Sequence, residues 1–128
     1  MNYYLLVSGI LTILMGVAHS VMGELLIIHP LQKNDTLPAV RGSVRHTKRT
    51  LRFTWHITSV FGFGVAAVLF RLSTIQSFQA DHIFIIRAIA VTFFISFLVS
   101  LIGARGKHAS WLVFLITAVL TWLSTMVS

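Results

Sequence analysis

Four uninterrupted apolar runs account for most of this chain of 128 residues. They cover residues 3–28, 51–70, 83–103 and 110–127. Each has about the 20 residues that an α-helix needs to cross the ~30 Å hydrocarbon core of a bilayer. The hydrophobic share of 56% also exceeds that of a typical soluble domain. The sequence therefore predicts an all-α fold with one domain over residues 1–128, a polytopic membrane protein built as an antiparallel bundle of four transmembrane helices.

The distribution of basic residues predicts how these helices are oriented. Eight of the ten lysine and arginine residues lie in or beside the first and third connections, and only two flank the second. Because positive side chains concentrate on the cytoplasmic side, we expect the first and third connections to face the cytoplasm and both termini to lie outside it. Orientation and contact with anionic lipid headgroups at the first connection then explain the net charge of +7. No aromatic residues alternate with these charges, so nucleic acid is not an expected partner.

Small residues mark one face of the first helix. Spacings of three and four residues place five side chains on this face: Gly9, Thr12, Gly16, His19 and Gly23. In lipid, small faces let helices approach closely, because packing rather than exclusion of water drives their association. We therefore expect His19 to point into the bundle.

Ionisable residues inside the apolar runs are the main functional signal, because charged groups are costly in a membrane. A rise of about 1.5 Å per residue places Glu24 and Arg52 at similar depths on the first and second helices. The same estimate places His19 level with His56. We expect an ion pair between Glu24 and Arg52. We also expect the two histidines to face each other, with hydrogen bonds to each other or to nearby hydroxyl groups, those of Ser20, Thr58 and Ser59.

The favoured interpretation of these polar residues is structural. They would orient the helices of an accessory membrane component that acts in a homodimer or in a larger membrane complex. The sequence shows no nucleophile beside a base, no paired acid and base, and no nucleotide motif. We therefore do not expect an enzyme in isolation.

A second interpretation is a cofactor site, for haem b or a transition metal. His19 and His56 would supply axial ligands to a haem iron, since histidines on different helices can ligate one haem. Four further residues complete this hypothesis: Gly16 and Gly23 would make room for the porphyrin, and Arg49 and Arg52 would meet its propionates. For a metal ion, the predicted ligands are His19, His56, Glu24 and His108.

A third interpretation is a small proton-coupled transporter. The apolar runs contain a single carboxylate, Glu24, and a four-helix chain of this size would need a homodimer to enclose a path. A lasting ion pair with Arg52 would weaken this interpretation, because a coupling carboxylate must change its protonation during the cycle.

Two stretches resemble a known pattern. The segments AHSVMGELLIIHPL and RTLRFTWHITSV, which together cover about the first half of the chain, are similar to small uncharacterised bacterial integral-membrane proteins of four helices. The resemblance implies this fold and a location in a membrane, which we expect to be the inner (cytoplasmic) membrane of a bacterium, and it carries no established activity.

Local signals predict where the helices begin and end. His29 and Pro30 should end the first helix, and the second should be helical from about Ser43. We expect Asp81 and Ser110 to be the N-caps of the third and fourth helices. Gly103 and Gly106 should close the third.

Overall fold

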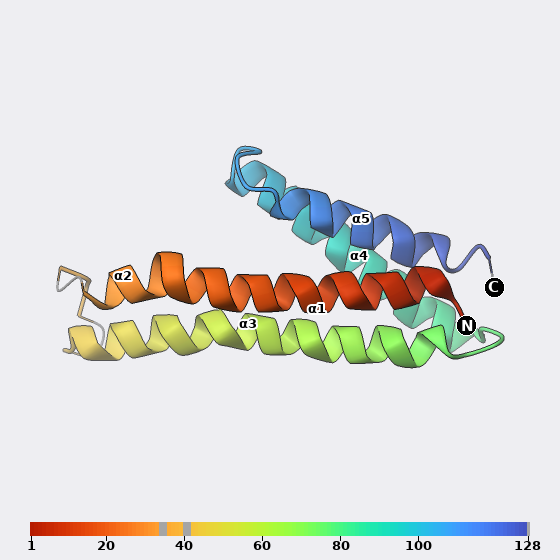
Figure 1. The fold of residues 1–128 in the computed structure, drawn as a ribbon, viewed down its shortest axis with the longest axis horizontal. Helices are drawn as coiled ribbons and strands as arrows, with labels where there is room; N and C mark the ends of the chain where they lie inside the picture. Colours follow the sequence, from red (N-terminus) through yellow and green to blue (C-terminus); the bar gives the residue numbers. More distant parts are fainter. Residues whose placement is uncertain (34–35, 40–41, 128) are drawn as a thin grey trace.

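The computed structural model describes residues 1–33, 36–39 and 42–127. Its regular structure in these residues is helical throughout, which confirms the predicted all-α class (Figure 1). The elements are α1 (Tyr3–Gly23), the π-helical η1 (Glu24–Ile28), α2 (His29–Gln32), α3 (Val44–Ser73), α4 (Ala80–Gly103) and α5 (Ser110–Leu123).

In the described residues, three helices are long and apolar enough to cross a membrane: Tyr3–Gln32, Val44–Ser73 and Ala80–Gly103. The predicted fourth span, 110–127, was too long, because α5 has only 14 residues and a length of about 21 Å. After Leu123, two hydroxyl side chains bond to backbone carbonyls that would otherwise accept only the N–H groups of a continuing helix. Ser124 Oγ donates to the carbonyl of Thr121 at 2.7 Å, and Thr125 Oγ1 donates to that of Trp122 at 2.9 Å.

The first helix continues through Pro30, where the sequence had predicted its end. In the π-helical η1, the backbone N–H of His29 donates to the carbonyl of Glu24, five residues earlier. Proline lacks an N–H, and its ring clashes with the carbonyl four residues before it in a regular helix. The π turn shifts the hydrogen-bond register by one residue just before the proline, so the chain can remain helical to Gln32.

The helices form two pairs. α1 and α3 lie side by side and antiparallel, and α5 packs against both α4 and α1 (Figure 1). The pair of α4 and α5 diverges from α1 and α3 toward the connection between α4 and α5.

At the opposite end of the molecule, Asn2 forms hydrogen bonds that link α1 to the ends of α3 and α5. Its side chain accepts from the N–H of Leu5 at 3.2 Å and donates to the carbonyl of Ser124 at 3.1 Å, and its backbone N–H donates to the carbonyl of Ser73 at 2.7 Å.

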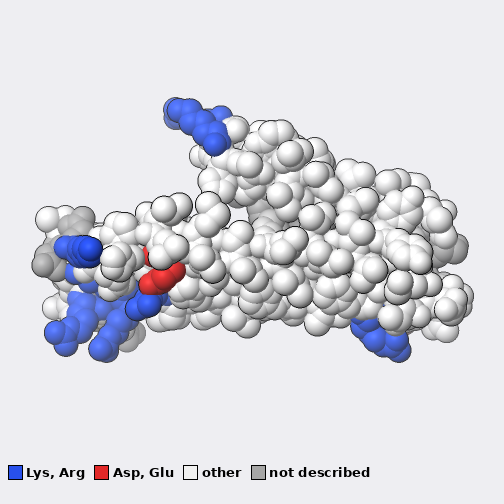
Figure 2. Space-filling view, in the orientation of Figure 1, with Lys and Arg blue, Asp and Glu red and all other residues white. Residues whose placement is uncertain are grey.

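The apolar core has residues from α1, α3, α4 and α5. Its buried cluster consists of Leu5, Leu69, Leu72, Ile86, Phe93 and Ala118. Large apolar side chains also cover the outside: Phe61 and Phe84 are 73% and 74% exposed. Figure 2 shows lysine and arginine gathered at the ends of the helices, with no charged side chain over the middle of this face. Such an outer surface suits contact with lipid.

The helix ends match the predictions in part. α3 begins at Val44 and α4 ends at Gly103, as expected, and Gly106 has a positive φ of 72° in the turn that follows. The two predicted N-caps were wrong. Gln79 precedes α4 and closes a capping box with His82, which places Asp81 inside the first turn. Ala109 precedes α5, and Ser110 is its first residue.

Candidate functional site

The small face of α1 receives aromatic side chains from α3. Gly9, Gly16 and Gly23 recur every seven residues and are buried, which confirms the predicted close approach of this face to a neighbouring helix. Each lies under one aromatic side chain: Phe70 over Gly9, Phe63 over Gly16 and Trp55 over Gly23. An added Cβ at Gly16 would come within 2.7 Å of the Phe63 ring. The glycines therefore fix how closely α1 and α3 approach and which residues stand opposite each other.

This register brings four polar residues together at the start of η1. Ser20 and Glu24 are four residues apart on one helix, and Arg52 and His56 are four apart on the other, so each pair shares a face. Arg52 Nη2 lies 2.8 Å from Glu24 Oε1, and its Nε donates to Oε2 at 3.2 Å. The predicted ion pair is thus confirmed.

His56 completes the polar cluster, which we define as Ser20, Glu24, Arg52 and His56. Its Nε2 lies 3.1 Å from Glu24 Oε2, and its Nδ1 lies 2.5 Å from Ser20 Oγ. With the proton on Nε2, the ring donates to the carboxylate and accepts from the hydroxyl. Both nitrogens of His56 therefore have partners on the first helix.

His19 makes different contacts from those predicted. Its ring stacks on the indole of Trp55, with centroids 4.5 Å apart and an angle of 4° between the planes. The indole Nε1 also donates to the His19 carbonyl at 2.9 Å. The two histidines lie at similar depth but are not hydrogen-bonded to each other. Neighbouring residues on a helix point about 100° apart, so Trp55 and His56 face different residues of α1. His56 faces Ser20, and its neighbour Trp55 faces His19.

A cavity of about 300 Å³ lies among α1, α3, α4 and α5. Most of its lining is apolar, including Met15, Phe93 and Phe114. Two of the residues that line it, His19 and Ser59, each carry a buried polar atom without a hydrogen-bond partner in the described part of the chain, His19 Nε2 and Ser59 Oγ. The sequence analysis missed this cavity because it depends on the divergence of α4 and α5 from the other two helices, which no local pattern reveals.

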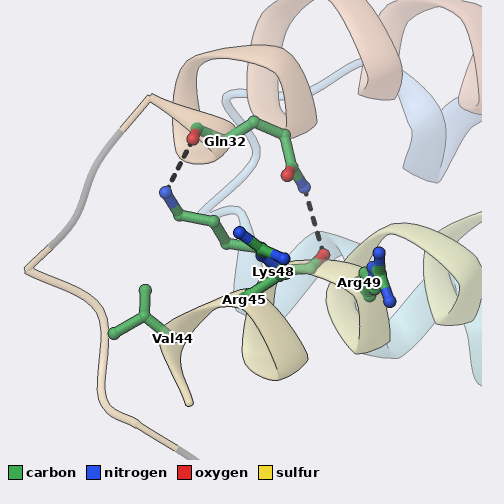
Figure 3. A pocket seen from close by; sticks show the side chains of 5 residues that line it. All are labelled: Gln32, Val44, Arg45, Lys48 and Arg49. Carbon is green, nitrogen blue, oxygen red and sulfur yellow. Dashed lines mark hydrogen bonds between the residues drawn. The ribbon is translucent and has the colours of Figure 1, made fainter.

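A basic cleft of about 570 Å³ lies where α2 faces the start of α3, lined by Gln32, Val44, Arg45, Lys48 and Arg49 (Figure 3). Lys48 Nζ donates to the Gln32 carbonyl at 2.7 Å, and Gln32 Nε2 donates to the Lys48 carbonyl at 3.1 Å. These two bonds join the walls of the cleft. Arg49, which was expected beside haem propionates, lies here with Arg45.

The residues expected to hold a cofactor are only partly brought together. In the described ranges, no group of three or more histidine, cysteine, aspartate or glutamate residues could hold a metal ion. Glu24 contacts His56, whereas His108 Nδ1 lies 3.0 Å from Ser110 Oγ at the connection between α4 and α5. The space expected for a porphyrin at Gly16 and Gly23 is covered by aromatic side chains of α3.

No family model, no curated protein and no solved structure matches the chain. The resemblance of its two segments to small bacterial membrane proteins therefore stays a prediction. Function must be inferred from the polar cluster, the cavity and the basic cleft.

Proposed function

We propose that this protein is an accessory component of a bacterial inner membrane, in which the polar cluster holds α1 against α3. Its four helices would form an antiparallel bundle in the bilayer. The connection between α2 and α3 and that between α4 and α5 would face the cytoplasm, and both termini would lie outside. The apolar outer surface and the charged helix ends support this arrangement (Figure 2).

The contacts of Glu24 carry the proposal. Its carboxylate meets a permanent cation and an imidazole, both from α3, and so links two helices. The side chains of Glu24 and Arg52 are 26% and 56% exposed, so the ion pair is partly shielded. A coupling carboxylate would have to leave both partners in every transport cycle, which would cost the free energy of both contacts. A structural role therefore fits these contacts better than proton coupling.

The same contacts favour a structural role over a haem site. Ligation by two histidines needs one free ring nitrogen from each, directed at a common iron. Iron could reach His56 only by displacing Ser20 or Glu24. His19 Nε2 has no hydrogen-bond partner among the described residues, but His19 lines the cavity and is not part of the polar cluster.

The basic cleft supports lipid headgroups as partners. Arg45 and Arg49 lie on successive turns of α3, before its apolar part, where a helix leaves the bilayer. Guanidinium groups bind phosphate well because their N–H groups match its oxygens. We infer that anionic headgroups contact this cleft and fix the position of the first connection at the membrane surface.

Proton flux and absorption can test the proposal. The purified protein would be reconstituted into liposomes that carry a pH gradient, and its visible spectrum recorded beforehand. We expect wild type and Glu24→Gln to leave the decay of the gradient unchanged, with no haem Soret band. Asp81→Asn is the matched control, because Asp81 is a carboxylate in the first turn of α4, outside the polar cluster.

Two results would overturn a purely structural role. One is a proton flux that wild type and Asp81→Asn support and Glu24→Gln abolishes, which would indicate coupling. The other is a Soret band that both His19→Ala and His56→Ala remove.

A further inference from the structure

We propose that the cavity among the four helices binds an uncharged, lipid-soluble molecule with an aromatic ring and a hydroxyl or carbonyl group, held by His19 and Ser59. This goes beyond the structural role of the polar cluster, because the cavity shares no residue with that cluster.

The two polar atoms indicate a ligand that forms hydrogen bonds. Ser59 is only 4% exposed, and its Oγ is buried and has no partner in the described part of the chain. His19 Nε2, on the facing helix, is also a buried atom without a partner there. Nearly all buried polar groups in proteins have a partner, so two such atoms on residues that line one cavity call for an explanation. An oxygen of a bound molecule could accept from the imidazole N–H and exchange a hydrogen bond with the hydroxyl.

The direction of the His19 side chain is fixed before any ligand arrives. Its ring lies flat on the indole of Trp55, and the same indole bonds its backbone carbonyl. Such preorganisation reduces the entropy that a ligand would otherwise lose in ordering the site. The stack restricts rotation of the imidazole, which favours its role as a binding group.

The lining residues and the volume of the cavity indicate the polarity, charge and size of the ligand. Phe93 and Phe114 lie with their ring centroids 6.3 Å apart, and Met15, Val65 and Ile89 add further apolar surface. No lysine, arginine, aspartate or glutamate lines the cavity in the described residues, so nothing would balance a charged ligand. A cavity of about 150 Å³ can hold one benzene ring. The volume here, about 300 Å³, suits a molecule of two rings.

Gly62 offers a way to block the cavity. It lines the cavity, and a Cβ added there would have no atom within 4 Å, so a larger side chain can start at this position without a clash at its Cβ. Gly64 also has open space around its Cβ, but it does not line the cavity. Gly62→Leu and Gly64→Leu are therefore a matched pair: the same substitution on the same helix, one inside the cavity and one outside.

The test uses 1-naphthol and naphthalene as probes, which differ by one hydroxyl. Binding to the full chain in detergent micelles would be measured by titration calorimetry. We expect wild type and Gly64→Leu to bind 1-naphthol about three- to tenfold more tightly than naphthalene, the range expected for one hydrogen bond. Ser59→Ala should reduce this preference, and Gly62→Leu should abolish binding of both probes. Thermal unfolding of each variant would verify that it is folded.

Three results would overturn the proposal. Equal affinity for the two probes would mean that the cavity accepts any apolar group, such as a lipid acyl chain. Heats no larger than those of protein-free micelles would mean that water or lipid fills it. Equal binding by the two leucine variants would place the binding site elsewhere.

Discussion

The indole of Trp55 lies so close to Gly23 that a Cβ atom there would collide with its Nε1, the same nitrogen that donates to the His19 carbonyl. One aromatic side chain thus sets both the spacing of α1 and α3 and the hydrogen bond between them. Glu24 follows directly along the chain. The close approach at Gly23 therefore places its carboxylate within reach of Arg52 and His56.

Substitution of Gly23 by alanine should loosen this contact. Because the added methyl group has no space, we expect a loss of about 1–3 kcal/mol in the free energy of unfolding, as for other overpacked sites. Gly64→Ala is the control, since its Cβ has open space and alanine favours the helix by up to about 1 kcal/mol. Denaturation in mixed micelles, followed by far-UV circular dichroism, would measure both. Equal stability of the two variants would contradict the close packing.

The general features of the fold followed from the sequence. Long apolar runs predict helices that can cross a membrane because the bilayer leaves the backbone few alternatives, and three of the four have that length. Glycines at helical spacing identified the packed face of α1. Depth along the helices correctly paired Glu24 with Arg52.

The errors arose where several interactions compete or where distant elements decide the outcome. Pro30 did not end its helix, because the π turn before it shifts the backbone hydrogen bonds by one residue. His19 and His56 lie at similar depth but point in different directions, so depth alone could not pair them. The cavity depends on how α4 and α5 diverge from α1, and this is a property of the assembled helices.

Reporter fusions can test the predicted topology. A reporter inserted after Leu37 should be cytoplasmic, and one at the C-terminus should lie outside, because eight of the ten basic residues flank the first and third connections. Alkaline phosphatase is active only outside the cytoplasm, and green fluorescent protein is fluorescent only inside. If both sites report the same compartment, the proposed arrangement of spans is wrong.

Anionic lipid should stabilise the protein through the basic cleft. We expect a higher melting temperature in nanodiscs that contain phosphatidylglycerol than in those of phosphatidylcholine alone, since each basic residue at an anionic surface contributes about 1 kcal/mol. The double variant Arg45→Gln and Arg49→Gln should lose most of this difference. Arg71→Gln, at the opposite end of α3, should retain it. If all three proteins show the same lipid dependence, the cleft is not the lipid contact.

The absence of cysteine makes a direct test of the helix register possible. Cysteine introduced at both Ser20 and His56, which contact each other, should form a disulfide on mild oxidation. The pair Ser20 and Val60 is the control, because Val60 lies one turn further along α3 and is 64% exposed. Mobility on non-reducing gels after proteolysis between the helices would detect the link. Cross-linking of the control pair alone would contradict the register.

A double-mutant cycle on Glu24 and Arg52 tests the structural role of the polar cluster most directly. The free energy of unfolding would be measured in lipid–detergent micelles for wild type, Glu24→Gln, Arg52→Gln and the double variant. Arg52 is 56% exposed and Glu24 26%, so the coupling should lie near the upper end of the range for exposed pairs, about 0.5–1 kcal/mol. The exchanged pair, Glu24→Arg with Arg52→Glu, should recover part of the loss. Additive single losses, with no recovery on exchange, would contradict a structural ion pair.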